Sequence, residues 1–576
     1  MDAPAVRKRA VIACSYCRKR KRRCDGAQPI CSLCRSADKR CVYPAASSNS
    51  LSNDTNPDRL AQLESVLAEH TRILQSLSEQ THVSANNDSL LHRHAAVEAE
   101  TPATVLPVLD MGTPVDFLGP MTIPIGHGTT TGDLLQMRPV SAMVGDYPSD
   151  IFLRIEQKRE LPRELSLSVQ MEDIPLPSFE SSVVEALVER YFESVHPGHP
   201  VLRRDEFDTI VSSPNEHMGE YSPQVALVLM VLAVAAAHVE PTVSQSQLPG
   251  IEYLRPGLQY ILRVWPDVCH TDVHLAQALF LAALYYGCLC RPIQAWRLVH
   301  MASTNIQHAF FQRPSLQQQD LIRTCWAVFV LECDLVADYH LPRSGIENLI
   351  DQLAYPDCGS VPQGYESSWL ANISARRLLN RIHCTIYASN AFGDTHPGHR
   401  SHPILALSDE LAHQLGTWWD LVPTSVKPDL NTANPSLGEA ILLLRYHACG
   451  DIICRPFLHY VCSQSRSTQP PDNNIMIQAI TCLEHCRAFL RIVSGVLRHR
   501  SPSAGIYLHA TLAALVNLAV ASYCALLRDH VPDMESLEDQ AISILEPWAL
   551  AGSSAQAMLR LAIAVKDKGR VLRMME

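Results

Sequence analysis

Six cysteines near the amino terminus repeat one spacing pattern twice. The pattern is C-x2-C-x6-C, and its two copies are separated by six residues. The cysteines are Cys14, Cys17, Cys24, Cys31, Cys34 and Cys41. Thiolates in C-x2-C pairs are common ligands of structural zinc, which takes four ligands in a tetrahedron. Six sulfurs complete two tetrahedra only if two of them bridge, so the repeat predicts two zinc ions, bridged most simply by Cys14 and Cys31.

A disulfide framework is the alternative use of these cysteines. The chain begins with Met-Asp-Ala-Pro and basic residues, and no apolar signal segment precedes the cysteines. Thiols of a protein that is not secreted are expected to stay reduced. A RING or LIM module would need eight ligands, and the first 60 residues contain no histidine. The zinc interpretation is therefore preferred.

Every residue between Cys17 and Cys24 is basic. These residues are Arg18, Lys19, Arg20, Lys21, Arg22 and Arg23. The matching segment of the second half, residues 35–40, has three basic residues and the acid Asp38. Dense Lys and Arg residues are typical of contact with DNA, although a nuclear import signal is the alternative. We expect the first half to face double-stranded DNA and the second half to pack behind it.

Charge divides the chain into a basic head and an acidic body. Residues 1–43 carry 12 Lys and Arg against 3 Asp and Glu, a net charge of +9. The rest of the chain carries 36 basic and 56 acidic residues, a net charge of −20. The overall charge of −11 hides this division. A positive head is the electrostatic footprint expected for phosphate binding.

The residues around the cysteines resemble a known family. Segments 13–26, 29–34 and 41–44 closely resemble the fungal binuclear zinc-cluster (Zn2Cys6) transcription factors. In that family the first and fourth cysteines bridge two metals, and the first helix reads CGG-type triplets in the major groove. The resemblance assigns base reading to Arg20 and Lys21. It leaves the other four basic residues, Arg18, Lys19, Arg22 and Arg23, for phosphate contacts or nuclear import.

A linker and a short coiled coil are predicted after the zinc-cluster domain of residues 1–45. Residues 46–59 are polar and read as a flexible linker. Residues 60–81 contain two heptad rows, Leu60, Leu67 and Leu74, then Leu63, His70 and Leu77. Such rows predict a coiled-coil seam, with a lone amphipathic helix as the alternative. Members of the resembled family commonly dimerise at this position, so a homodimer is expected.

Residues 82–175 are predicted to form a largely disordered tether. From Pro102 to Pro148 there are 7 Pro and 6 Gly in 47 residues, a composition typical of disorder. Segments 105–110 and 115–118 mix acids with large apolar residues. These two segments are candidates for recruiting the transcription machinery.

Residues 176–576 are predicted to form an all-α body, which makes the chain mostly α. Its apolar runs have helical length, and no pattern of strands stands out. The examples are residues 225–238, 275–286, 321–335, 437–454 and 511–527. None reaches the roughly 20 uninterrupted apolar residues of a membrane span, so no membrane contact is expected.

The body also resembles the regulatory domain of the fungal transcription factors. The matching segments are 191–202, 326–334, 341–346, 444–447 and 455–458. In the family this domain is thought to restrain or release activation, sometimes by binding a metabolite. The resemblance implies a nuclear regulator of RNA polymerase II transcription, most simply a pathway-specific activator of metabolic, including secondary-metabolite, genes. A repressor or scaffold with the same head is the alternative.

An enzymatic body is the remaining hypothesis. The sequence contains no G-x-S-x-G, G-x4-G-K-[ST], G-x-G-x-x-G or H-E-x-x-H motif, so no catalytic residues are proposed. Cysteine pairs in the body are interpreted as core residues rather than metal ligands. They are Cys288 with Cys290, Cys449 with Cys454, and Cys482 with Cys486. The histidines at 396, 399 and 402 are interpreted as loop residues.

Overall fold

The computed structural model describes two compact units, residues 1–54 and 55–576, which are treated separately below. The described residues are Cys17, Cys24, Ala27, 30–37, 39–41, 122–124, 126–166, 174–177, 181–212, 222–239, 248–266, 272–312, 318–357, 364–387, 401–432, 434–464 and 471–575. The predicted linker, the coiled coil of 60–81 and the tether up to residue 121 lie outside this set. In the first unit the described helix is the short α2 (Ser32–Ser36).

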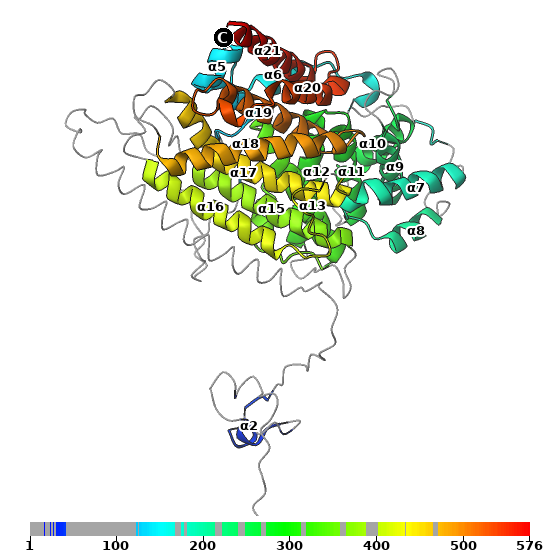
Figure 1. Cartoon of the computed structure of the whole chain (residues 1–576). Helices are drawn as coiled ribbons and strands as arrows, with labels where there is room; N and C mark the ends of the chain where they lie inside the picture. The colour runs from blue at the N-terminus through cyan, green and yellow to red at the C-terminus, as the bar shows by residue number, and fades with distance from the viewer. Residues whose placement is uncertain are drawn as a thin grey trace, which may run out of the picture. The chain divides into compact units, whose positions relative to one another are not determined.

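The second unit, the body, is helical, and no strand occurs among its described residues. The mostly α fold class is thereby confirmed (Figure 1). Its earlier helices are α4 (Thr131–Gln136), α5 (Arg138–Val144), α6 (Ile151–Lys158), α7 (Ser181–Ser194), α8 (Arg204–Ser212), α9 (Pro223–Ala237), α10 (Ile251–Val264), α11 (Val273–Cys288), α12 (Pro292–Gln312), α13 (Gln319–Tyr339) and α14 (Glu347–Ile350). Its later helices are α15 (Gly364–Ile386), α16 (Ser401–Leu421), α17 (Leu437–Ser463), α18 (Asn473–Val496), α19 (Ala504–Ser522), α20 (Met534–Leu545) and α21 (Ser554–Met575).

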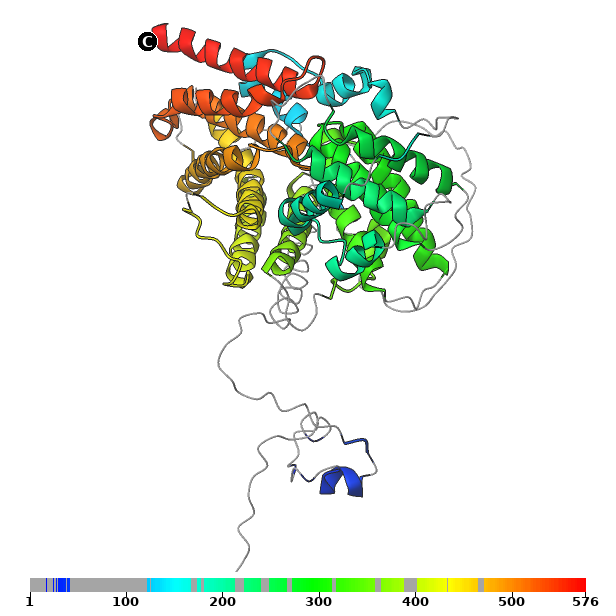
Figure 2. The ribbon, with the colours of Figure 1, turned by 90° about the vertical axis from the view of Figure 1, so that its right-hand side faces the viewer.

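Two hydrophobic cores organise the body. The first core gathers buried side chains of α7 to α13, and the second gathers those of α16 to α21 together with α4, α5 and α6. Figure 2 shows the corresponding green group and yellow-to-red group of helices beside each other. Helix α15 belongs to both, because Trp369 and Ile373 lie in the first core while Leu378 and Ile382 lie in the second.

The helices form where the sequence combines apolar runs with capping residues. Helix α9 is apolar on nearly every side, as expected for a helix that neighbours surround. Helix α17 begins with a capping box, in which the Ser436 hydroxyl accepts a hydrogen bond from the Glu439 backbone and the Glu439 carboxylate accepts one from that of Ser436. Each apolar run singled out in the sequence lies in a helix, except that His238 follows the end of α9 and residues 523–527 follow the end of α19.

The predicted disordered tether is wrong for its second half, because residues 126–166 belong to the body. Leu134, Leu135, Val140 and Phe152 are buried in the second core. The carboxylate of Glu156 accepts hydrogen bonds from the backbone N–H and the hydroxyl of Ser554, both at 2.8 Å. Burial of these apolar side chains explains the order, which the Pro and Gly content had obscured.

Helix α19 is long and apolar enough to cross a membrane by length and composition. In this structure 78% of its most apolar stretch is buried inside the body. Asn517, in the middle of the helix, is fully buried and hydrogen-bonded to Asp451. These contacts fit the central helix of a packed core.

Candidate metal centre and nucleic-acid interface

The described cysteines of the head gather into two groups that share one member. The ligand atoms of Cys17, Cys24 and Cys31 lie within 4.8 Å of one another, and so do those of Cys31, Cys34 and Cys41. Cys31 is therefore the sulfur common to both groups among the described residues. Each group needs one further ligand to complete a tetrahedron. Cys14, which lies outside the described residues, is the remaining cysteine of the pattern.

The spacing of the sulfurs fits zinc and excludes disulfides among them. The sulfurs of Cys17 and Cys31 are 3.7 Å apart. Two thiolates on a tetrahedral zinc, each about 2.3 Å from the metal, would be about 3.8 Å apart. None of the described cysteines forms a disulfide, and Cys17, Cys31 and Cys34 are fully buried. Buried thiols at this separation are arranged as metal ligands rather than as a redox pair.

Hydrogen bonds from backbone N–H groups to cysteine sulfurs stabilise the second half of the head. The Cys31 sulfur accepts a hydrogen bond from the Cys34 N–H (3.4 Å) and caps α2. The Cys41 sulfur accepts one from the Cys31 N–H (3.3 Å). Such donors stabilise thiolate ligands and orient them toward a metal. The local fold is thus built around the metal centre.

The basic residues predicted to contact DNA, 18–23, lie outside the described residues. In the described second half, Arg35, Lys39 and Arg40 are all exposed. Arg35 also donates a hydrogen bond to the Ile30 carbonyl (3.4 Å). These cations add positive charge to the surface of the head.

A buried ion-pair network in the body was missed by the sequence analysis. The Asp334 carboxylate on α13 accepts a hydrogen bond from Nη1 of Arg376 on α15 (3.0 Å). It also accepts hydrogen bonds from Nη1 and Nη2 of Arg445 on α17 (2.7 and 2.5 Å). Burial alone would raise the pKa of Asp334, but the two arginines outweigh it and hold the pKa below its ordinary value. The network joins helices of both cores. In the sequence, the charged residues inside the apolar helical runs were the signal that could have indicated this network.

The cysteine pairs of the body behave as core residues. Asp451, Cys482 and Cys486 bring three ligand atoms within 4.8 Å, yet Asp451 already receives hydrogen bonds from Arg455 and Asn517. Burial raises the pKa of Cys482 well above its ordinary value. Cys288, Cys290, Cys449 and Cys454 are also buried. Their burial favours neutral thiols rather than thiolate ligands.

Comparison with known families assigns the two parts of the chain. Residues 12–50 match the fungal Zn(2)-Cys(6) binuclear cluster domain, and residues 188–388 match the fungal specific transcription factor domain. The chain therefore carries a fungal Zn2Cys6 binuclear cluster domain followed by a fungal specific transcription factor domain, which are domains of DNA-binding transcription regulators rather than of enzymes. Its cluster holds two zinc ions, and the family implies a function in the nucleus.

Several curated proteins are similar to the chain at low identity. The candidate transcription factor ecdB of Aspergillus rugulosus is 23% identical over 84% of this chain and 83% of its own length. The depudecin biosynthesis cluster-specific transcription activator of Fusarium langsethiae is 27% identical over 48% of this chain and 43% of its own. The aspyridones cluster regulator of Emericella nidulans is 32% identical over 16% and 12%. No solved structure matches the chain.

Proposed function

We propose that this protein is a pathway-specific transcriptional activator that binds CGG-type DNA triplets through its zinc-cluster head. The sharing of Cys31 between two cysteine groups carries the proposal. Residues 18–23 lie between Cys17 and Cys24 of the first group, so zinc would hold both ends of this basic segment. A basic helix fixed in this way is suited to a major groove, where guanine offers its O6 and N7 acceptors.

The proposed division of roles follows the two groups. Cys14 and Cys31 bridge the two zinc ions, Cys17 and Cys24 complete the first site, and Cys34 and Cys41 complete the second. Arg20 and Lys21 contact bases. The neighbouring cations, Arg18, Lys19, Arg22 and Arg23, contact phosphates, which position a protein without reading sequence.

Zinc content tests the bridging roles. Cys31→Ala in the full-length chain should remove both ions, because this sulfur belongs to both sites. Cys17→Ala and Cys34→Ala should each remove mainly one ion, so they serve as matched controls. Metal analysis of the three purified variants gives the answer directly. Equal zinc content in all three would contradict the bridging assignment.

Selection from a random duplex pool tests the target. The zinc-loaded full-length chain should enrich CGG-type triplets. Lys21→Ala should weaken binding to the selected site by about 1–3 kcal/mol and relax specificity, because it removes a base contact. Arg23→Ala is the matched control and should weaken binding to all sequences alike. Enrichment without CGG-type triplets would refute the proposed target.

The remaining parts of the proposal concern partners and genes. Residues 60–81 would pair two chains on DNA, and segments 105–110 and 115–118 would recruit the transcription machinery. The similarity to two regulators of biosynthesis clusters supports a metabolic gene set as the target. Expression of a reporter behind the selected site should fall when the gene is deleted. Increased expression would instead identify a repressor.

A further inference from the structure

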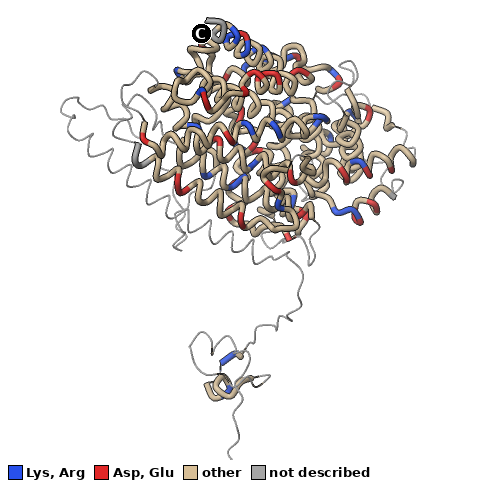
Figure 3. The backbone as a smooth tube through the Cα atoms, in the orientation of Figure 1, with Lys and Arg blue, Asp and Glu red and all other residues tan. Residues whose placement is uncertain are grey.

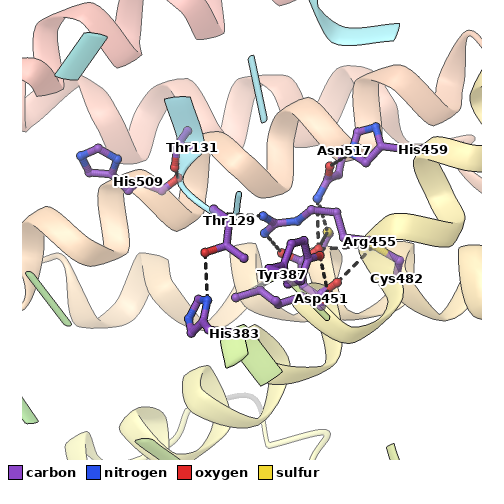
Figure 4. Close-up of polar contacts among 12 residues, drawn as sticks. Thr129, Thr131, His383, Tyr387, Asp451, Arg455, His459, Cys482, His509 and Asn517 are labelled. Carbon is purple, nitrogen blue, oxygen red and sulfur yellow. Dashed lines mark hydrogen bonds and ion pairs between the residues drawn. The ribbon is translucent and has the colours of Figure 1, made fainter. Parts of the chain in front are cut away.

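A cavity of about 90 Å³ lies among α13, α15, α17 and α19 of the body. A single water needs about 10–15 Å³ of such space, so the cavity has room for a small organic molecule. Thr129 and Thr131 form part of its wall, and both belong to residues 126–131, which we call the strap. Figure 4 shows Thr129 near Arg455 and His383, and Thr131 near His509.

The polar wall of the cavity carries an excess of positive charge. Arg376 and Arg445 share the carboxylate of Asp334, while Arg455 pairs with Asp451. Three guanidinium groups are thus balanced by two carboxylates. Burial and the neighbouring Asp334 raise the pKa of the further acid, Asp338, well above its ordinary value and so favour its neutral form.

Histidine adds no charge to this wall. Burial, followed by the charge of Arg376, lowers the pKa of His383 well below its ordinary value. The Nδ1 atom of His383 lies 2.9 Å from the Thr129 hydroxyl. His383 is therefore neutral at neutral pH and leaves the excess of guanidinium charge unchanged.

Several buried polar atoms of the cavity residues have no hydrogen-bond partner among the described residues. They are Nη2 of Arg376, Nε of Arg455, Oδ2 of Asp338 and Nε2 of His383. Arg376 and Arg455 are only 1% and 4% exposed. Buried polar groups are normally satisfied. A ligand with hydrogen-bonding oxygens would satisfy those that face it.

The rest of the cavity lining is largely apolar and includes Leu379, Leu444, Ile452, Phe489 and Ile506. A site that combines charged donors with such side chains suits an amphipathic small molecule. Water or an inorganic anion alone would leave the apolar lining without a complementary contact.

We propose that this cavity binds a small organic monocarboxylate. Its carboxylate lies against Arg376 and Arg455, and its apolar part lies against Leu444, Ile452 and Phe489. Arg455 also donates a hydrogen bond from Nη1 to the Thr129 carbonyl (3.3 Å), so a carboxylate that engages Arg455 also meets the strap. The proposal of this ligand site does not depend on the DNA sequence that the head binds.

Calorimetric titration of the zinc-loaded full-length chain tests the ligand class. The probes are benzoate and isovalerate, with their amides, benzylamine and acetate as comparisons. Saturable binding of both larger carboxylates is expected, with binding at least about tenfold weaker for the amides, which lack the charge that pairs with guanidinium. Acetate should also bind more weakly because it leaves the apolar lining uncovered. Failure of both carboxylates to bind, equal binding of the amides, or tighter binding of benzylamine would overturn the proposal.

Cavity-filling variants test the location. Ala510→Leu on α19 and Ala448→Leu on α17 occupy space in two different walls and should each weaken benzoate binding at least about tenfold. Ala557→Leu on α21 is the matched control, because this half-buried alanine does not line the cavity. Unchanged binding in both wall variants would overturn the site.

Hydrogen exchange of the parent chain provides a readout that does not depend on variants folding. Benzoate should protect amides of the strap and of α19 near Ala510, because the ligand contacts both. Protection confined to other helices would refute the location. Duplex binding of the same samples, measured without benzoate, separates this result from failure of the DNA-binding proposal.

Discussion

Asp334 offers a sharp test of the packing of the body, because its removal isolates two buried arginines. The side chains of Asp334, Arg376 and Arg445 are 5%, 2% and 14% exposed. Removing one partner of a buried pair leaves an uncompensated charge and typically costs about 3–5 kcal/mol. Asp334→Asn keeps the shape of the side chain and removes its charge. We therefore expect the free energy of unfolding to fall by about 3–5 kcal/mol at neutral pH.

Urea denaturation of the full-length chain, followed by tryptophan fluorescence, measures this loss. Asp150→Asn is the control, since it breaks the Asp150–Arg154 pair, whose side chains are 37% and 58% exposed. Exposed pairs of this spacing contribute about 0.3–0.5 kcal/mol. The two variants remove the same chemical group, so the difference between them isolates the effect of burial. A loss below about 1 kcal/mol for Asp334→Asn would refute the reasoning.

The pH dependence gives a second check on Asp334. Its pKa is lowered in the folded chain, where burial opposes ionisation but Arg445 and Arg376 prevail. The contribution of the carboxylate is therefore present above the unfolded pKa of about 3.9 and is lost as the pH falls through the lower folded value. The difference between parent and Asp334→Asn should shrink below about pH 4. A difference that grows with acidification would contradict the assigned charge state.

Three further predictions concern glycine packing, a buried amide and zinc. Gly287→Ala on α11 should lower the free energy of unfolding by about 1–3 kcal/mol, because a Cβ there would lie 2.4 Å from the Pro502 carbonyl oxygen. Gly416→Ala on α16, where a Cβ would have no atom within 4 Å, should raise the free energy of unfolding by up to about 1 kcal/mol. Urea titration measures both variants, and an increase in the free energy of unfolding for Gly287→Ala as well would refute the prediction for Gly287. Asn517→Leu should cost about 1–3 kcal/mol in the same assay, because it removes a buried donor to Asp451; an unchanged value would contradict this. Chelation should abolish duplex binding in a mobility-shift assay while helical circular dichroism persists, since the body has its own cores; retained binding would contradict a structural role for zinc.

Local patterns explain most of what the sequence predicted. The cysteine spacing is short-range, so it indicates the metal groups without knowledge of the fold. Helices such as α9 and α11 are apolar runs of helical length between capping residues, and such signals are also local. The same local character explains why the head and the all-α body were predictable.

The glycine and proline content led to a wrong prediction of disorder where these residues fit the packing of the helices. Gly132 lies in α4 where a Cβ would be 1.8 Å from the Ser149 carbonyl oxygen, so close contact requires glycine there. Pro139 occupies the first turn of α5, a position that tolerates proline. Counting these residues as signs of disorder hid a segment whose apolar side chains enter the second core.

Long-range pairings were not predictable because the partners are far apart in the chain. Asp334 and Arg445 are separated by 111 positions, and neither has a neighbour in sequence that indicates the other. The same pair lines the cavity, together with Thr129 and Thr131 of the strap. A sequence can show that a charge lies in an apolar helix, but only the packing of α13, α15 and α17 shows what compensates it.

The strap connects the cavity to the amino-terminal end of the described body. Residues 122–124 and the strap, 126–131, are the first described residues of the body. Thr122 accepts a hydrogen bond from Arg343, and its carbonyl accepts one from the Cys384 thiol. The Thr129 carbonyl accepts one from Arg455, which also lines the cavity. A ligand held by Arg455 would therefore pack against the strap and restrict its motion, while Leu134 and Leu135 hold the next turn in the core.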